Sequence, residues 1–243
     1  PLDPGADLET VLLEMALSDL RTVERRLERL AGEPKAERNP LEMDLLRRCR
    51  DHLSRGGALR QMALSEEDRK RLRGYAPLTI MPMLVVFNVG EDDVSGKALE
   101  HARGVATEAS LPSLAVCAEL ELEISQLAPH EQSVFLADYG LTEPARDRLL
   151  RAAFEILDTI TFFTVNENEA RAWLIHRGTT AYEAAGKIHS DIQAGFVRAE
   201  VTPLKWLEEL GSFHACKERG YTRVEGRDYV IQDGDIIHVR FTR

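Results

Sequence analysis

The chain has 243 residues, of which 44% are hydrophobic and 30% are charged, and its formal net charge is −10. This composition is typical of a globular chain with more than one domain, long enough to bury real cores. The sequence shows no apolar run of membrane-spanning length and no secretory leader, so we expect a cytoplasmic protein without a membrane partner. Cys49, Cys117 and Cys216 are scattered and predicted to be reduced thiols, and no spacing of His or Cys indicates a metal site.

The negative charge is concentrated in the middle of the chain. Residues 75–159 carry 5 Lys and Arg against 14 Asp and Glu, whereas residues 1–74 carry 15 of each kind and residues 160–243 carry 11 against 12. Because nucleic acid binding requires basic side chains at phosphates, the acidic middle segment is a poor candidate for an RNA surface. The residue pattern changes at the same boundaries, so we predict three domains: 1–74, 75–159 and 160–243.

The N-terminal segment has the apolar period of a helix. Apolar residues recur three and four positions apart from Asp7, the expected N-cap, to Leu30, and the spacing resumes from Leu41 to Gly56 after a break at 32–40. Two such helices joined by a short turn are expected to form an antiparallel coiled-coil hairpin. Its outer arginines favour a solvated face laced with salt bridges, although a binding surface remains an alternative. They are Arg21, Arg25, Arg26, Arg29, Arg47, Arg48 and Arg50.

The middle segment has the pattern of a doubly wound α/β domain. LTIMPMLVVFNV (78–89) predicts a parallel strand that begins after Pro82 and is buried on both faces, and SLAVCAE (113–119) predicts a second strand. Helices are expected at 98–109 and 121–127. Because such sheets bind ligands beyond the carboxyl ends of their strands, Asn88, Glu91 and the turn at 117–119 are candidate site residues.

The strand end reads Asn88-Val89-Gly90-Glu91. In P-loop GTPases the corresponding N-K-x-D offers a carboxylate that takes two hydrogen bonds from guanine, so a longer acid should relax or change the preference for the base. N-x-x-E is a short pattern, and a merely polar strand end is the alternative. The nearest approach to a phosphate-binding loop, residues 90–98, has an extra residue between its glycines, three acids, and Ala98 in place of the magnesium-binding hydroxyl. We therefore reject it as a phosphate site.

The C-terminal segment predicts a small α+β sheet domain of the ubiquitin-like β-grasp type. TFFTVN (161–166) and EARAWLIH (169–176) are strand-like runs separated by the hairpin signal Glu167-Asn168. A helix is expected to open at Thr179-Thr180, FVRAEV (196–201) is expected to form a strand, and residues 228–241 are expected to form two short strands around the turn at 232–235.

FFTVNENEARAWLIHRGTTAYEAAGKIHSDIQAGFVRAEV (162–201) and RVEGRDYVIQDGDIIHVRF (223–241) together resemble the TGS domain of the YchF proteins, the Obg-like ATPases. The order of hairpin, N-x-x-E strand and TGS segment agrees with that family over most of the chain. The resemblance implies a P-loop-type fold in the middle segment, a preference for ATP over GTP, magnesium as a cofactor of the intact protein, and ribosome binding. It also implies that Asn88, the Val89 backbone and Glu91 face adenine, with Cys117, Ala118 and Glu119 in the place of the S-A-x loop.

The sequence also departs from the family. It starts where the family's hairpin starts, without the P-loop and switch segments, has Gly90 in the turn, and has Cys117 where the loop usually has Ser. We expect no catalytic residues here and no hydrolysis by this chain alone. One hypothesis is that it is the C-terminal portion of a YchF-like, ribosome-associated ATPase that keeps the base-reading edge. The other is a nucleotide-free adaptor whose TGS domain and hairpin bind RNA or protein.

Two further expectations concern partners. A doubly wound sheet without its first strands exposes an edge, so we expect further polypeptide or a second copy to cover residues 75–159, which sedimentation at high concentration and binding of an apolar dye would test. Basic side chains of the TGS segment are candidates for contact with RNA or the ribosome. Pairing with Glu169, Glu183 and Asp191 is the alternative role. The candidates are Arg171, Arg177, Lys187 and Arg198.

Overall fold

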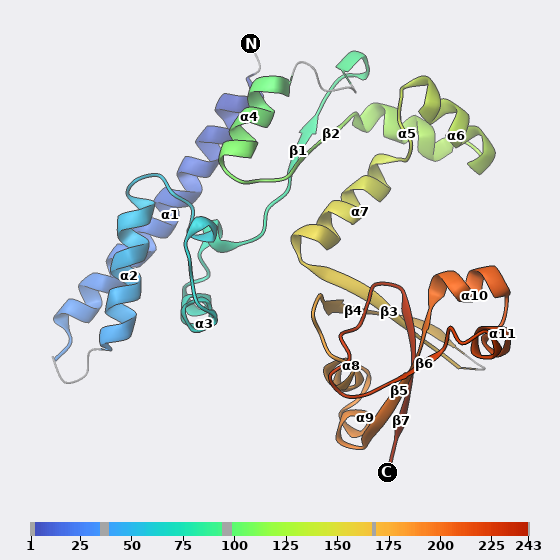
Figure 1. Cartoon of the computed structure of the whole chain (residues 1–243). Helices are drawn as coiled ribbons and strands as arrows, with labels where there is room; N and C mark the ends of the chain where they lie inside the picture. Colours follow the sequence, from blue (N-terminus) through green and yellow to red (C-terminus); the bar gives the residue numbers. More distant parts are fainter. Residues whose placement is uncertain (1–2, 35–38, 94–98, 167–168, 243) are drawn as a thin grey trace. The chain divides into compact units, whose positions relative to one another are not determined.

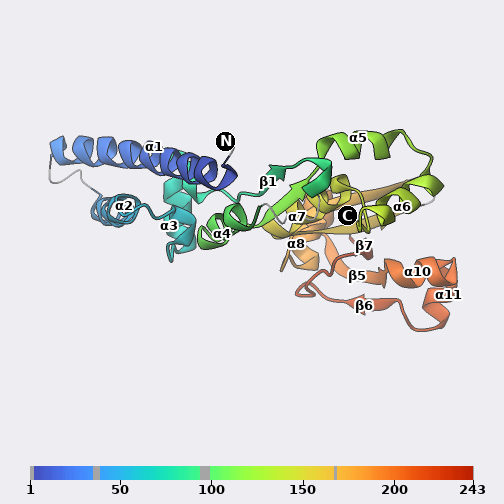
Figure 2. The same ribbon diagram turned by 90° about the horizontal axis from the view of Figure 1, so that it is seen from above.

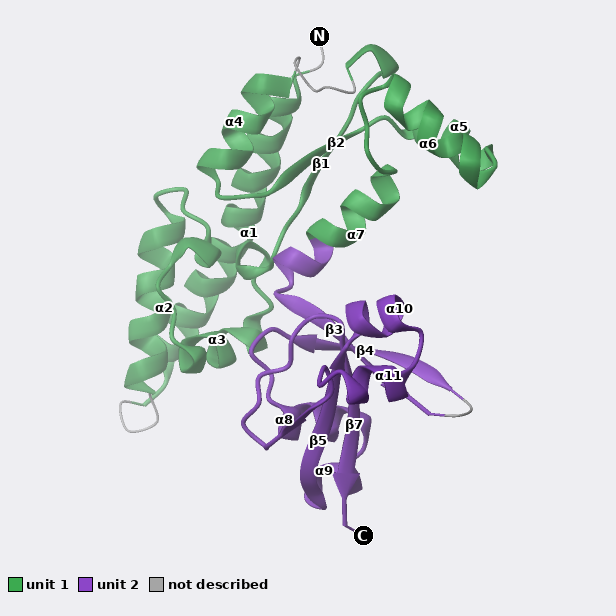
Figure 3. Ribbon diagram, turned by 45° about the vertical axis from the view of Figure 1, so that its right-hand side comes forward, with its two compact units in different colours: residues 1–152 green, residues 153–243 purple. Residues whose placement is uncertain are grey.

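The computed structural model describes residues 3–34, 39–93, 99–166 and 169–242. The chain divides into two compact units, unit 1 (Pro1–Ala152) and unit 2 (Ala153–Arg243), coloured separately in Figure 3. The division into two units confirms the prediction of a chain with more than one structural unit. The boundary between residues 1–74 and 75–159 stays a prediction. Residues 94–98, most of the rejected phosphate loop, and the hairpin signal at 167–168 lie outside the described residues. None of the helices in the described part has the length and apolar character that a membrane crossing requires.

The helices that begin in unit 1 are α1 (Pro4–Gly32), α2 (Pro40–Leu53), α3 (Glu66–Leu72), α4 (Glu100–Glu108), α5 (Ala118–Gln126), α6 (Pro129–Asp138) and α7 (Ala145–Ile156). Short 3-10 turns lie at Leu59–Gln61, Arg73–Tyr75, Leu78–Ile80 and Glu91–Asp93. The first two helices form the predicted hairpin, with α2 running back beside α1 (Figures 1 and 2). The N-cap of α1 is Asp3, whose Oδ1 accepts hydrogen bonds from the amides of Gly5 and Ala6 at 3.1 Å. Asp7, the predicted cap, lies in the first turn instead.

The hairpin buries the row of apolar side chains that the helical period of the sequence predicts. Val23 and Leu30 of α1 meet Leu45, Leu46 and Cys49 of α2, and each of these side chains is at most 3% exposed. Each buried leucine stabilises the fold by about 1.5–3 kcal/mol, which explains why the two helices associate through this row.

A buried carboxylate joins α1 to the segment that leads into the first strand. Asp19 is 4% exposed and accepts hydrogen bonds from the amides of Leu78 and Thr79, both at 2.8 Å, and from the Thr79 hydroxyl at 2.7 Å. The Thr79 hydroxyl in turn accepts a hydrogen bond from the Leu59 amide at 3.1 Å. Because a buried carboxylate requires several donors, these bonds fix the segment against the helix.

The sheet of unit 1 consists of β1 (Val85–Asn88) and β2 (Ser113–Val116), which pair in parallel as predicted, with Asn88 opposite Val116. The prediction that the first strand is buried on both faces is wrong. Phe87 is 7% exposed and packs with Leu8 of α1 and Ala102 of α4, whereas Val86 is 46% exposed. Helices α1 and α4 pack on the Phe87 face, whereas the side chain of Val86 on the other face stays largely exposed.

Unit 2 contains a five-stranded mixed sheet in the order β4-β3-β7-β5-β6 (Figure 1). Its strands are β3 (Thr159–Val165), β4 (Ala170–His176), β5 (Phe196–Pro203), β6 (Arg223–Glu225) and β7 (Asp235–Phe241), and its helices are α8 (Ala181–Ile188), α9 (Ser190–Ala194), α10 (Leu204–Leu210) and α11 (Phe213–Glu218). The predicted hairpin of β3 with β4 is confirmed, and β3 with β7 is the parallel pair. Phe162, Val201 and Ile237 of the sheet pack with Ala184 and Ala185 of α8. One face of the sheet is therefore the core face.

The prediction of two strands between residues 228 and 241 is wrong, because only β7 forms there. Asp235 is 2% exposed, and its Oδ2 accepts hydrogen bonds from the Tyr229 hydroxyl at 2.8 Å and the Gln232 amide at 2.9 Å. These bonds hold the preceding segment as a turn, and Val230 makes only an isolated bridge to Thr180. Helices α3, α6, α7, α9, α10 and α11 and strand β6 were not expected from the sequence.

We predict that Asp19→Ala destabilises unit 1 by about 3 kcal/mol, because the amides of Leu78 and Thr79 would stay buried without their acceptor. Urea denaturation followed by circular dichroism measures the change. Asp51→Ala is the matched control, since that carboxylate is exposed and, among the residues that the structure describes, pairs only with its neighbour Arg50. Its effect should lie within about 0.5 kcal/mol of zero. Equal midpoints for the two variants would refute the role given to Asp19.

Candidate nucleotide-base edge and basic surfaces

The side chain of Asn88 connects the carboxyl end of β1 to the start of α5, which follows β2. Its Oδ1 accepts a hydrogen bond from the Ala118 amide at 3.1 Å. Ala118 is the first residue of α5, and the N-cap Cys117 makes no side-chain capping bond. Asn88, which lies on the neighbouring strand, therefore accepts a hydrogen bond from an amide at the start of α5 that has no acceptor within the helix. The structure thus brings together two of the predicted groups, Asn88 and the 117–119 turn.

Glu91 has a partner that the sequence did not reveal. The hydroxyl of Tyr139, at the end of α6, donates a hydrogen bond to Glu91 Oε1. This bond to a carboxylate favours the protonated phenol and raises the pKa of Tyr139 to about 12. Tyr139 also packs against Phe135, with ring centroids 5.4 Å apart. No local pattern predicts the contact, because the two residues lie 48 positions apart.

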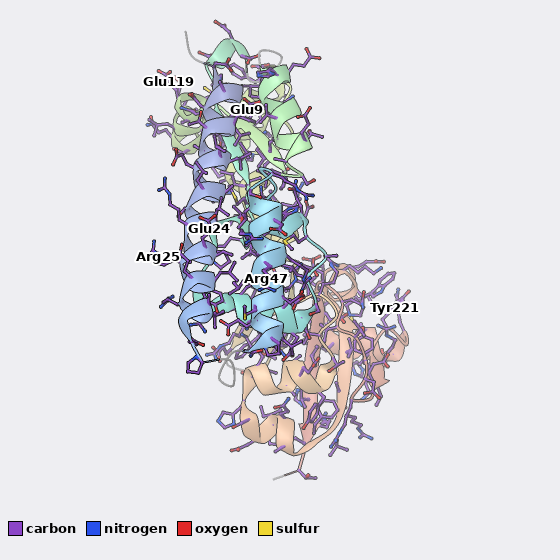
Figure 4. The ribbon with its side chains drawn as sticks, turned by 90° about the vertical axis from the view of Figure 1, so that its left-hand side faces the viewer. Glu9, Glu24, Arg25, Arg47, Glu119 and Tyr221 are labelled. Atoms are coloured by element: carbon purple, nitrogen blue, oxygen red, sulfur yellow. The ribbon has the colours of Figure 1, made fainter. Side chains whose placement is uncertain are left out.

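The other predicted residues differ in what they present at this edge. The Val89 amide donates to the Val116 carbonyl at 2.9 Å, and the Val89 carbonyl accepts no hydrogen bond from the described residues. The Cys117 side chain is 3% exposed and packs in an apolar cluster with Leu120 and Ile124. Glu119 is exposed (Figure 4). The Cys117 thiol is therefore not accessible at this edge.

The edge has a defined hydrogen-bonding character. With Asn88 Oδ1 engaged by Ala118, the Nδ2 group stays a donor that is not used by the described residues. The Val89 carbonyl and Glu91 Oε2 are acceptors. The edge therefore offers hydrogen-bonding groups of both kinds, a donor on Asn88 and acceptors on Val89 and Glu91. In the described part of the chain no cluster of His, Cys, Asp or Glu has a geometry that would hold a metal ion.

The four basic residues predicted to contact RNA do not lie on one face of the unit 2 sheet. Arg171 lies two and four positions before the inward side chains Trp173 and Ile175, and so on the core face at the edge of the sheet. Its guanidinium carbon lies 5.2 Å from the centroid of the Trp173 ring, and the side chain pairs with Glu169 at 2.8 Å. Arg198 alternates with buried Ala199 and so lies on the opposite face. The alternative role in pairing therefore describes Arg171 well.

Arg177 and Lys187 also lie away from Arg198. Arg177 follows the end of β4 and pairs with Asp158 at 3.3 Å. Lys187 is exposed on α8, which packs on the core face of the sheet. Arg198 differs from Arg171 and Arg177, because it has no hydrogen-bond or ion-pair partner among the described residues.

The outer arginines of the hairpin also include both paired and unpaired side chains among the described residues. Arg26 pairs with Glu42 at 2.8 Å and Arg48 pairs with Asp68 at 3.2 Å, which confirms a face laced with salt bridges at these positions. Arg25 is exposed and points away from α2 (Figure 4). The hairpin thus combines paired and solvated arginines.

Comparisons with known proteins agree with this architecture. A family model, YchF-GTPase_C, described as a protein of unknown function (DUF933), matches residues 159–242. "Ribosome-binding ATPase YchF" of Haemophilus ducreyi is 36% identical over 243 residues, which cover 99% of this chain and 67% of the relative. The chain belongs to the YchF family. The protein of the same name from Bacillus subtilis is 37% identical over 250 residues, again covering 99% of this chain and 67% of the relative.

Solved structures share the YchF fold. "Structure of the Schizosaccharomyces pombe YchF GTPase" matches 98% of this chain and 66% of its own, with a TM-score of 0.83 at 24% identity. A GTP binding protein from Pyrococcus horikoshii matches with a TM-score of 0.63 at 20% identity, over 100% of this chain and 74% of its own. The chain therefore spans about two thirds of the length of the YchF proteins that it matches.

We predict that Tyr139 stays protonated at about pH 10.5, because its hydrogen bond to Glu91 raises the pKa to about 12, above the ordinary value of roughly 10. Glu91→Gln removes the negative charge and should lower the pKa of Tyr139 toward the ordinary value. NMR of tyrosine Cζ-labelled protein measures both states. A Tyr139 signal that titrates at the same pH in both proteins would exclude the contact.

Proposed function

We propose that the chain is the ribosome-associated portion of a YchF-type nucleotide-binding protein, built from a coiled-coil hairpin (1–74), part of a P-loop-type α/β domain (75–159) and a β-grasp TGS domain (160–243). Similarity over 99% of the chain to proteins named ribosome-binding ATPases carries this proposal. ATP and magnesium belong to the activity of the whole protein, about one third of whose length lies outside the match.

We further propose that the chain contributes the contacts to the base and that these favour adenine. A carboxylate that selects guanine takes two hydrogen bonds, and in this chain Glu91 Oε1 already accepts one from Tyr139. Asn88 Nδ2 would donate to the ring, and the Val89 carbonyl and Glu91 Oε2 would accept from an amino group. Bound ATP would supply the phosphoryl group of the family's chemistry, while the residues described here orient the base.

The first test is association with ribosomes. We expect the chain to co-sediment with ribosomes through a sucrose cushion at about 50 mM salt and to be largely released at about 200 mM, because contacts to phosphates weaken steeply with salt. Quantification of the pelleted protein measures this. Recovery in the supernatant at every salt concentration would refute ribosome association by this part of the protein.

The second test is binding of the base without phosphates. We expect adenosine to shift the amide resonances of Val89 and Ala118 with a Kd on the order of 1 mM, which corresponds to about 4 kcal/mol from base contacts alone. Guanosine should bind more weakly. Asn88→Ala should abolish the adenosine shifts, whereas the matched control Asn166→Ala, which removes the same side chain directly after β3 in unit 2, should keep them.

Hydrolysis serves as a negative control in the same experiment. No turnover of ATP or GTP above buffer is expected, since the sequence encodes no phosphate cradle and phosphoryl transfer depends on one. Turnover that Asn88→Ala abolishes would contradict this. Ribosome binding without any response to adenosine would instead favour the alternative, a nucleotide-free adaptor in which Asn88 serves only to cap α5.

A further inference from the structure

A groove lies on the face of the unit 2 sheet opposite the core face. It has a volume of about 260 Å³ and lies where α11 meets β5 and β7. Its side chains combine charge with an apolar ring: Glu200, Thr202, Phe213, Lys217, His238 and Arg240. The strands place them there by alternation, because Ala199, Val201 and Ile237 point into the core.

The groove holds more positive than negative charge. Arg240 Nε lies 3.1 Å from Glu200 Oε1. The hydrogen bond from Arg240 lowers the pKa of the Glu200 carboxyl, and the nearby charges of Lys217 and His238 lower it further by smaller amounts. Lys217 itself makes no direct ion pair with any described residue. One carboxylate therefore faces two permanent cations and a histidine.

Arg198 increases this excess. It lies directly opposite Arg240 in the antiparallel pair of β5 and β7, on the same face as the groove. Like charges at directly opposite positions destabilise a sheet. Only Arg240 has a carboxylate partner within the described residues. An anion that accepts hydrogen bonds from both guanidinium groups would offset this repulsion.

An aromatic ring completes the surface. Phe213 is 40% exposed and lies four positions before Lys217 on α11, so both side chains face the groove. A cationic groove beside an exposed ring is the combination with which proteins hold single-stranded nucleic acid, through its phosphates and one stacked base. An acidic peptide would use the cations but not the ring.

We propose that this groove binds a single-stranded segment of RNA, with phosphates at Arg198, Lys217 and Arg240 and a base stacked on Phe213. The proposal rests on the proposed ribosome association and names the surface responsible. It moves the RNA contact from Arg171 and Arg177, whose charges are already paired, to the opposite face of the sheet.

The test measures binding of a labelled oligouridine of about ten nucleotides by fluorescence anisotropy, over a range of salt concentrations. Arg198→Ala with Lys217→Ala should weaken binding roughly tenfold at low salt and reduce the slope of log K against log salt by about 1.4, since each phosphate contact to a single strand contributes about 0.7. Phe213→Ala should weaken binding roughly tenfold without changing the slope.

Arg171→Ala with Arg177→Ala is the matched control, because it removes the same net charge from two arginines that are already paired with carboxylates outside the groove. It should leave affinity and slope nearly unchanged. Circular dichroism establishes that every variant is folded. Equal losses in both double variants would reduce the effect to net charge and overturn the groove. Equal affinity for a duplex of the same length would also overturn it.

Co-sedimentation with ribosomes separates this inference from the proposed function. Arg198→Ala with Lys217→Ala should reduce the pelleted fraction at intermediate salt, and the control variant should not. Ribosome binding that both variants retain fully would overturn the groove and leave the proposed function intact. Specific oligouridine binding by a chain that never pellets with ribosomes would support the groove and refute the function.

Discussion

The buried carboxylate of Asp19 is the interaction on which the arrangement of unit 1 depends. It lies within α1 and is saturated by the backbone of residues 78 and 79, a few positions before β1. Through the Thr79 hydroxyl the same network reaches the Leu59 turn after α2. Apolar packing brings the two helices together, but it is tolerant of small sliding movements. Directional hydrogen bonds to a carboxylate are not, so they set where the strand begins relative to the hairpin.

The position of β1 in turn determines what its carboxyl end meets. Parallel pairing with β2 places Asn88 next to the start of α5, where a helix whose cap is Cys117 lacks an acceptor for its first amides. Asn88 satisfies that requirement with its carbonyl oxygen and is left with a directed amino group. The same bond thus stabilises the fold and orients a donor. On the other side, Tyr139 holds Glu91 and leaves one carboxylate oxygen available.

The two faces of the unit 2 sheet differ because only one of them is covered by α8. On the core face, Phe162 and Ile237 pack against small helical residues, and the arginine at its edge lies on Trp173 and pairs with Glu169. On the other face, Arg198 and Arg240 are placed side by side by the strand register. Glu200 offsets the charge of Arg240, whereas Arg198 has no carboxylate partner among the described residues, so their repulsion is compensated only in part.

The sequence alone determined the helical hairpin, the parallel strand pair, the hairpin of β3 with β4, and the helix that Thr180 caps. Each follows from a local period or a turn signal, which acts over a few residues and needs no tertiary contact. The resemblance in residues 162–201 and 223–241 identified the family for the same reason, since it lies in contiguous residues. Composition and period did not indicate that one face of β1 is left exposed, because burial depends on which elements pack on the strand.

The contacts that define the candidate surfaces were decided by tertiary structure. Tyr139 reaches Glu91 across 48 positions, and Arg198 meets Arg240 across 42, as counted from their residue numbers. The sequence indicated that Arg171 and Arg177 are candidates for contact with RNA, but it did not show which carboxylates lie beside them. Charged groups interact across space with residues from any part of the chain, whereas the apolar period predicts only how residues close in sequence are arranged. The residue types at a surface are therefore readable from the sequence, but their partners are fixed by the register of strands and the packing of helices.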